Sequence, residues 1–111
     1  MKKVIIINSE FFGRGDDGLG EKLMGAFLRK LWAKEEKPDA IICYNSGVKL
    51  MAKGASVLDA MMGLYEAGVD ILACGTCVEF YGLNSDMQAG RISNMDEISA
   101  ILMSAESVVT I

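Results

Sequence analysis

Three short apolar runs, separated by segments with helical periodicity, constrain the fold of this chain most strongly. Residues 4–7 are all β-branched, and residues 40–44 and 69–73 are two further runs rich in aliphatic side chains. A strand that is apolar on both faces is typical of a parallel sheet covered on both sides. A last strand is predicted over residues 107–111. The alternation of strands and helices therefore indicates an α/β layer fold with a mostly parallel sheet.

The ends of the intervening helices are marked by capping residues. A helix over residues 19–34 follows Asp16, whose carboxylate favours a helix N-terminus. Ser56 is expected to cap a second helix and Asn94 a third, because each is followed three residues later by an acidic residue. Gly68 is the expected stop of the second helix. A further short helix is expected directly after Cys74 and Cys77, which form a Cys-x-x-Cys pair.

Three connecting stretches are harder to interpret. Residues 48–51 are interpreted as a short extra strand, and residues 84–91 as a polar loop. Residues 13–18 match the G-x-G-x-x-G pattern of dinucleotide-binding loops. Asp16 and Asp17 would, however, place two negative charges where a pyrophosphate should bind. A flexible loop leading into the next helix is therefore favoured over a nucleotide site.

Composition excludes several classes of protein. The chain has 111 residues and 51% hydrophobic content, which predicts one globular domain over residues 1–111. A net charge of −4, without a basic cluster, argues against binding to nucleic acid or to an anionic membrane. No apolar stretch is long enough for a signal peptide or a membrane span, so a cytoplasmic location is expected. Without histidine, and with one Cys-x-x-Cys pair, no metal or other cofactor is expected.

The Cys-x-x-Cys pair is the strongest candidate for chemistry. Cys74 is predicted at the tip of a buried strand, which would deliver its thiol to the start of a short helix, where N–H groups stabilise a thiolate. Cys77 follows three residues later. Cys74 is therefore expected to be the functional thiol, and Cys77 a resolving or second carrier thiol. Cys43 lies inside an apolar strand and is expected to be an inert core residue. Arg14 and local N–H groups are expected to lower the pKa of the functional thiol.

Polar residues follow the predicted strands at the same edge of the sheet. The carboxyl ends of parallel strands meet there, which is where ligands of such sheets bind. The candidate binding residues are Asn8, Ser9, Arg14, Asn45, Ser46, Gly47, Gly75 and Thr76. We expect them to form one shallow pocket with Cys74, in which amides and N–H groups bind a small anion or a sulfur anion. The alternative is that both asparagines only satisfy the backbone of turns.

Two other functional classes remain open. Dithiol–disulfide exchange would use both Cys74 and Cys77, but a thioredoxin-like site needs a proline in a later loop, and none follows Cys77. A non-catalytic oligomeric scaffold, or a small-ligand-binding module, would need neither thiol.

Several separated motifs resemble the DsrE/DsrF-like sulfur-relay family, most closely the C-terminal domain of the YedF-type, sulfurtransferase-like proteins of selenium metabolism. The similar segments are residues 13–17, 45–50, 74–77, 81–83 and 90–95. The resemblance implies a three-layer α/β/α sandwich with about five strands. It also implies a homo-oligomer, either a trimer or a hexamer.

The resemblance further implies the chemistry of a sulfur or selenium carrier. A strand-end cysteine would accept sulfur as a persulfide from a donor protein and pass it to an acceptor protein. Cys74 matches the sulfur-carrying cysteine of the family, and Cys77 matches a second cysteine found in some branches. The N-terminal sulfur-carrier domain that usually precedes this domain is expected to be missing, because Met1 lies almost at the first strand. The implied role is thus a sulfurtransferase-like carrier rather than a defined enzyme.

Overall fold

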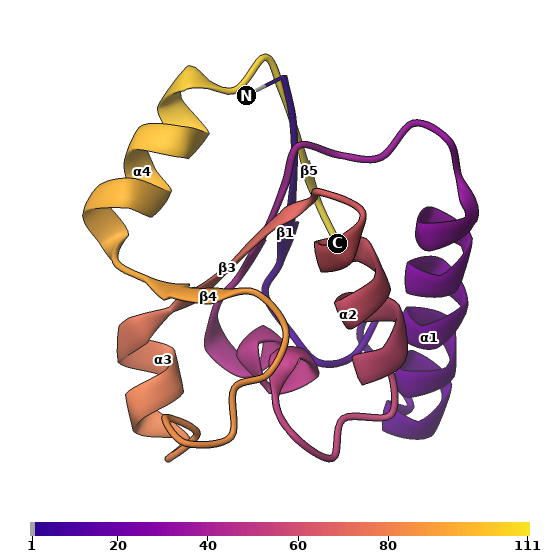
Figure 1. Ribbon diagram of the computed structural model, residues 1–111. Coiled ribbons are helices and arrows are strands. Elements are labelled where there is room, and N and C mark those ends of the chain that lie inside the picture. Colours follow the sequence, from indigo (N-terminus) through magenta and orange to yellow (C-terminus); the bar gives the residue numbers. More distant parts are fainter. Residues whose placement is uncertain (1) are drawn as a thin grey trace.

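The computed structural model describes residues 2–111 and contains a five-stranded parallel sheet (Figure 1). The strands are β1 (Lys3–Ile7), β2 (Ala40–Cys43), β3 (Asp70–Cys74), β4 (Arg91–Ser93) and β5 (Ser107–Thr110). Their order across the sheet is β4-β3-β2-β1-β5, and every neighbouring pair is parallel. The parallel sheet predicted from the apolar runs is confirmed.

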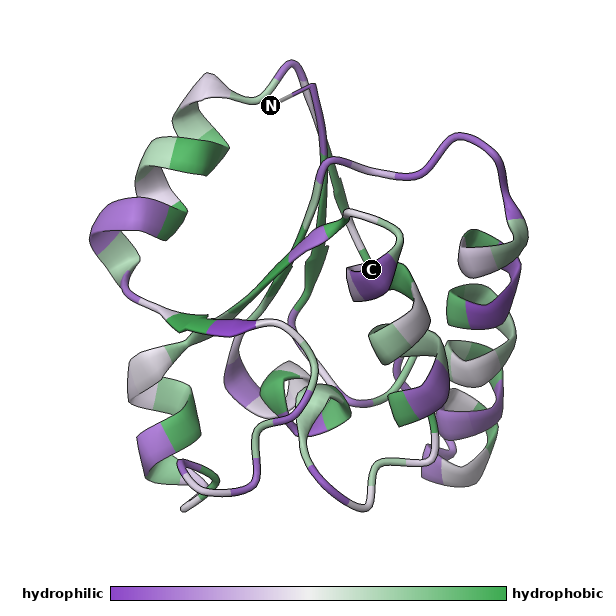
Figure 2. Ribbon diagram, viewed as in Figure 1, coloured by the Kyte–Doolittle hydropathy of each residue, from purple (hydrophilic) through white to green (hydrophobic). Residues whose placement is uncertain are grey.

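Helices cover both faces of the sheet and produce a three-layer sandwich (Figure 1). They are α1 (Asp17–Ala33), α2 (Leu58–Glu66), α3 (Gly75–Phe80) and α4 (Met95–Ser104), with the 3-10 helix η1 (Asn45–Met51) after β2. The helices α1 and α2 and η1 pack on one face, against side chains such as Ile5 and Ile41. Helix α4 packs on the other face, where Ile98 belongs to the same core cluster as Val4 and Ile42. The strands are accordingly among the most apolar segments in Figure 2.

Most of the predicted helix ends are confirmed, and one is wrong. The Asp16 carboxylate accepts a hydrogen bond from the N–H of Leu19 at 2.8 Å, and Asn94 Oδ1 accepts one from the N–H of Glu97 at 3.0 Å. Gly68, with φ of 102°, follows the end of α2. Ser56 does not cap α2: the N-cap position is Val57, without a side-chain hydrogen bond.

Two connecting segments differ from the sequence interpretation. Residues 48–51 do not form a strand but belong to η1, whose apolar residues fill the core beside α2. The polar stretch 84–91 is not a loop to its end: Arg91 begins β4, a strand of only three residues that sequence pattern did not reveal. Both errors have the same cause, because segments this short carry too few side chains to establish a helical or strand period.

The short strand β4 is held in place by a cluster of charged side chains. The guanidinium of Arg91 donates two hydrogen bonds of 2.9 Å to Asp70 on β3 and two more, of 2.7 and 2.8 Å, to Glu97 on α4. The hydroxyl of Ser93 also donates to Glu97. The hydrogen bonds from Arg91 and Ser93 lower the pKa of Glu97 to about 2. Arg91 therefore joins the edge strand to its neighbouring strand and to the helix that follows it.

This cluster predicts a specific loss of stability in acid. A carboxyl whose pKa is lowered on folding stabilises the fold above its unfolded pKa, and the contribution is lost as pH falls through its folded pKa. For Glu97 the window extends from the ordinary value of 4.5 down to about 2. We expect Glu97→Gln to be less stable than wild type at neutral pH and to lose less stability across this window. Urea midpoints measured at several pH values provide the test, with Glu66→Gln on the exposed end of α2 as control. Parallel pH profiles for wild type and Glu97→Gln would contradict the role given to this carboxylate.

Candidate functional site

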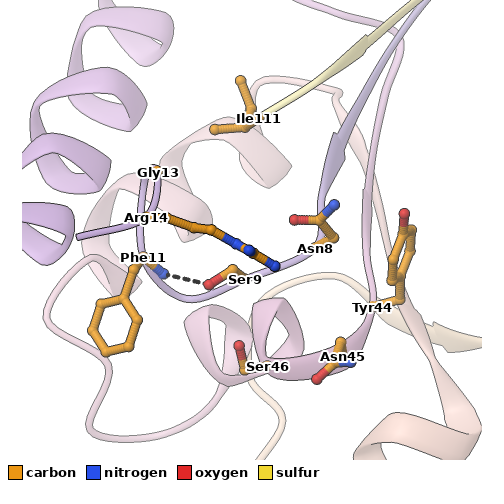
Figure 3. Close-up of a pocket in the computed structure, with 9 residues that line it drawn as sticks. All are labelled: Asn8, Ser9, Phe11, Gly13, Arg14, Tyr44, Asn45, Ser46 and Ile111. Atoms are coloured by element: carbon orange, nitrogen blue, oxygen red, sulfur yellow. Dashed lines mark hydrogen bonds between the residues drawn. The ribbon is translucent and has the colours of Figure 1, made fainter. Parts of the chain in front are cut away.

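Polar residues from the ends of β1 and β2 meet in an open pocket of about 530 Å³ at the carboxyl edge of the sheet (Figure 3). Its lining residues are Asn8, Ser9, Phe11, Gly13, Arg14, Tyr44, Asn45, Ser46 and Ile111. Five of the predicted binding residues, Asn8, Ser9, Arg14, Asn45 and Ser46, are therefore brought together. We call this the polar pocket. Figure 3 shows the side chain of Arg14 pointing into it, toward Asn8 and Ser9.

Local hydrogen bonds and one close approach give the polar pocket its shape. The hydroxyl of Ser9 accepts a hydrogen bond from the N–H of Phe11 at 3.1 Å, and the hydroxyl of Ser46 accepts one from the N–H of Glu10, also at 3.1 Å. Gly47 lies so close to the end of β1 that a Cβ would overlap the carbonyl oxygen of Ile7. The missing side chain of Gly47 thus allows η1 to close one side of the pocket.

Cys74 does not share the polar pocket, contrary to the prediction. It is the last residue of β3 and only 4% exposed, and it packs with Leu72 and Ile98 in the core beneath α4. The reason is the alternation of side chains along a strand: Leu72 and Cys74 face α4, whereas Ala73 faces the opposite core. Sequence placed Cys74 at the correct edge of the sheet, but its side chain lies in the core beneath α4 and does not line the polar pocket.

Cys77 lies one turn further along and is the more accessible thiol. It is partly exposed and lines a second pocket of about 360 Å³. The other lining residues are Asn45, Thr76, Phe80 and Tyr81, and we call this the thiol pocket. Asn45 lines both pockets, so the polar pocket and the thiol pocket are neighbours. Cys77 also packs against the core cluster that contains Cys74, and its side chain interacts with the Cys74 thiol, so the two thiols lie side by side.

Asn45 connects these parts through both its backbone and its side chain. Its N–H donates a hydrogen bond to Cys77 Sγ at 3.1 Å, and its Oδ1 accepts one from the hydroxyl of Tyr81 at 3.0 Å. Within residues 2–111, Asn45 is the only non-glycine residue with positive φ, at 50°. Asparagine tolerates this left-handed conformation better than most residues, and such conformations concentrate at functional sites.

The surroundings of Cys77 and Cys43 raise the pKa values of both thiols. Burial raises the pKa of Cys77, and contact with the Cys74 thiol raises it further, whereas the hydrogen bond from the N–H of Asn45 opposes both effects. Burial alone raises the pKa of Cys43 to about 12, in agreement with an inert core residue. At neutral pH, Cys77 is therefore mainly a protonated thiol rather than the pre-formed thiolate that sequence suggested for this motif.

Sequence reasoning missed the aromatic and charged residues around Cys77. Tyr81 is four residues after Cys77 and therefore lies on the same side of α3. Lys49 Nζ lies 4.5 Å from the centre of the Tyr81 ring and forms an ion pair with Glu10 at 3.3 Å. The i, i+4 spacing of Cys77 and Tyr81 was the available signal. Gly75 has a different role, because a Cβ there would lie 2.9 Å from the carbonyl oxygen of Ser93 and would push α3 away from β4.

Accessibility and pKa together predict the order in which the thiols react. In the native protein, iodoacetamide should modify Cys77 first and Cys43 last. The rate at Cys77 should still be rising at pH about 8.5, the value for a free thiol, because only the thiolate attacks. Peptide mass mapping after timed labelling at several pH values measures both. Preferential labelling of Cys74, or a rate at Cys77 that levels off near neutral pH, would contradict the assignment.

Residues 2–111 contain no group of three or more cysteine, aspartate or glutamate side chains placed to hold a metal ion. In the same part of the chain, no helix combines the length and the apolar character that crossing a bilayer requires.

The fold is shared with several solved structures, all of them 18% identical to this chain. YchN from E. coli matches with a TM-score of 0.67 over 100% of both chains. MTH1491 from Methanobacterium thermoautotrophicum, a protein of unknown function, matches with a TM-score of 0.72 over 99% of this chain and 98% of its own. BT1422 from Bacteroides thetaiotaomicron, a conserved protein of unknown function, matches with a TM-score of 0.65 over 99% and 95%.

This chain therefore shares the α/β fold of YchN and of the other two proteins. No protein family model and no curated protein matches the sequence. Structural similarity at 18% identity shows the arrangement of strands and helices alone. The function has to be argued from the site itself.

Proposed function

We propose that this protein is a carrier of sulfur or selenium that holds the atom as a persulfide, or its selenium equivalent, at the Cys74–Cys77 pair. The observation that carries the proposal is the placement of two adjacent free thiols at the carboxyl end of β3, one of them lining an open pocket. This edge is where parallel sheets place their ligands and reactive groups.

Accessibility divides the roles of the two thiols. Sequence favoured Cys74 as the carrier, but Cys77 is the sulfur that lines the thiol pocket, and we assign the first step to it. The Cys77 thiolate attacks the outer sulfur of a donor persulfide, forms Cys77–S–S⁻ after loss of a proton, and releases the donor thiolate. An acceptor thiolate then attacks the outer sulfur and restores Cys77. The rate of loading should increase with pH because Cys77 is mainly protonated at pH 7.

A backbone donor supports the anionic form of the bound sulfur. The N–H of Asn45 already points at Cys77 Sγ from 3.1 Å. A hydrogen bond to a charged acceptor is stronger than one to a neutral group, so this N–H stabilises a thiolate or persulfide more than a thiol. The hydrogen bond from Tyr81 to the Asn45 side chain holds that N–H in position. Asn45 is thus the donor, and Tyr81 is a positioning residue that acts through it.

The polar pocket would bind an anionic part of the donor or the acceptor. Arg14 supplies a positive charge beside the amide of Asn8 and the hydroxyl of Ser9. Gly47 and Gly75 shape the two pockets without contacting the ligand, whereas Thr76 lines the thiol pocket. The polar pocket also favours a second candidate function, a non-catalytic module that binds a small anion. Neither Cys74 nor Cys77 lines the polar pocket, so such a module would bind its anion without either thiol.

The proposed partners are sulfur-donor and sulfur-acceptor proteins in the cytoplasm, and a second copy of the chain in a trimer or hexamer. Exposed apolar side chains support self-association: Phe80 is 81% exposed, Met95 57% and Ile92 45%. They lie on α3, α4 and β4, which neighbour one another in Figure 1. Size-exclusion chromatography with light scattering tests this assembly, and a monomer at micromolar concentration would refute it. The chain's net charge of −4 provides no basis for nucleic-acid binding.

The carrier proposal is tested by intact-protein mass spectrometry after brief exposure to glutathione persulfide and acid quenching. Wild type should gain the mass of one sulfur atom at the earliest times. The double variant Cys74→Ser/Cys77→Ser should gain nothing, while Cys43→Ala should behave as wild type because Cys43 is fully buried. The same gain in the double variant would exclude the pair as the site. No gain in any protein, together with retained anion binding, would favour the binding module.

A further inference from the structure

A persulfide on Cys77 would present one sulfur atom to Cys74 and the other to thiols from outside the protein. Cys77 faces the thiol pocket, whereas Cys74 lies beneath it in the core under α4. A persulfide on Cys77 consists of an inner sulfur, which is the original Sγ, and an outer sulfur that extends from it. The pocket side is the open side, so the outer sulfur extends toward solvent. The inner sulfur stays where Sγ is now, in contact with Cys74.

This arrangement favours attack on the inner sulfur. A thiol that meets the outer sulfur removes it as a new persulfide, as in sulfur relay. A thiol that meets the inner sulfur displaces the outer sulfur as hydrosulfide and forms a disulfide. Cys74 is placed for the second reaction. Its four-residue motif with Cys77 also has the spacing at which thiol–disulfide oxidoreductases form their disulfide.

We propose that Cys74 resolves a persulfide on Cys77, so that this protein can release its cargo as hydrosulfide as well as pass it to a partner thiol. The inference rests on the proposed carrier function. In the step, Cys74–SH and Cys77–S–S⁻ become the Cys74–S–S–Cys77 disulfide and HS⁻. The Cys74 sulfur is oxidised, the outer sulfur is reduced, and the Cys74 proton leaves on the hydrosulfide.

The backbone around the pair is compatible with a disulfide. Cys74 is the N-cap of α3, with φ of −62° and ψ of 119°, and therefore lies outside the helical part of the motif. Residues three apart at a helix start have Cβ atoms about 5–6 Å apart, which is about 1–2 Å more than a disulfide needs. A small change at the end of a six-residue helix closes this gap. A thiol of the glutathione class, or a dithiol, then reduces the disulfide at the accessible Cys77.

A single-turnover experiment on the full chain tests the inference. Reduced protein is mixed with one equivalent of glutathione persulfide, and protein mass and free sulfide are followed over time. In wild type, the gain of one sulfur atom should give way to a loss of two hydrogens, with one sulfide released per chain. In Cys74→Ser, the sulfur should remain bound and no sulfide should be released. Cys74→Ala serves as the second variant if serine destabilises the buried site.

The controls separate this inference from the carrier function. Cys43→Ala should behave as wild type, and after the reaction of wild type only Cys43 should react with iodoacetamide under denaturing conditions. The mass gained by Cys74→Ser must be that of sulfur and not of glutathione, because a mixed disulfide would give the same final product by another route. A persulfide that persists in wild type as long as in Cys74→Ser would overturn the resolving role and leave the carrier intact. No sulfur gain in any of the proteins would overturn both.

Discussion

Replacing Cys77 by serine is expected to abolish sulfur loading from a persulfide donor, whereas replacing Cys74 should leave the first loading step intact. The difference follows from accessibility: Cys77 lines the thiol pocket, and Cys74 is only 4% exposed. A serine hydroxyl at position 77 would retain the hydrogen bond to the N–H of Asn45 and most of the packing. The loss would therefore be chemical, because an alcohol is not ionised near neutral pH and does not attack sulfur.

The measurement is the fraction of protein that gains one sulfur atom at the earliest time point, with urea midpoints to establish that each variant is folded. Cys43→Ala is the matched control, since it removes a cysteine that is 0% exposed. Loading that survives in Cys77→Ser and disappears in Cys74→Ser would return the carrier role to the buried thiol. It would also imply that the core under α4 opens to admit the donor.

Gly47→Ala adds a single methyl group, and it is expected to lower the free energy of unfolding by an unusually large amount for so small a change. A Cβ at this position would overlap the carbonyl oxygen of Ile7 and lie 3.4 Å from the N–H nitrogen of Ser9. Both are backbone atoms that cannot rotate away, so β1 and η1 must separate. Forced overpacking of this kind costs about 1–3 kcal/mol, and the rigid partner places Gly47→Ala at about 3 kcal/mol or more.

Urea unfolding at neutral pH measures this loss, and Gly54→Ala is the matched control. Gly54 has φ of 91°, and no atom lies within 4 Å of the position that a Cβ would occupy. Alanine there would have a strained backbone conformation but would not clash with a neighbour. That strain costs about 1–2 kcal/mol. We expect Gly47→Ala to be clearly the less stable of the two and to load sulfur more slowly, because η1 carries Asn45. Equal losses would mean that the contact with Ile7 relaxes easily.

Local sequence signals determined the layers of this fold. The all-β-branched run at residues 4–7 and the aliphatic run at 40–44 could be stabilised only in a sheet covered on both faces, and they form β1 and β2. Asp16 and Asn94 predicted helix starts correctly because capping depends on one side chain and the backbone beside it. Where the signal was short, as for η1 and β4, the interpretation failed.

The candidate site was predicted only in part. Sequence placed Asn8, Asn45 and both thiols at the carboxyl edge of the sheet, because strand order and direction suffice for that. Asn8 and Asn45 do share the polar pocket. Tyr81 was missed because its hydrogen bond joins it to Asn45, 36 positions away, and the i, i+4 spacing from Cys77 does not by itself reveal that contact.

Sequence alone thus determined the parallel sheet apart from β4, the helices apart from η1, and the presence of two cysteines three residues apart at the end of a buried strand. Only the tertiary structure decided which thiol meets solvent. That depends on the face of β3 to which Cys74 belongs, and on α4 covering that face. The left-handed conformation of Asn45, which directs an N–H at Cys77, was decided in the same way. Both features arise from contacts between distant segments, and the physical reason is that burial and hydrogen-bond direction are properties of the packed chain.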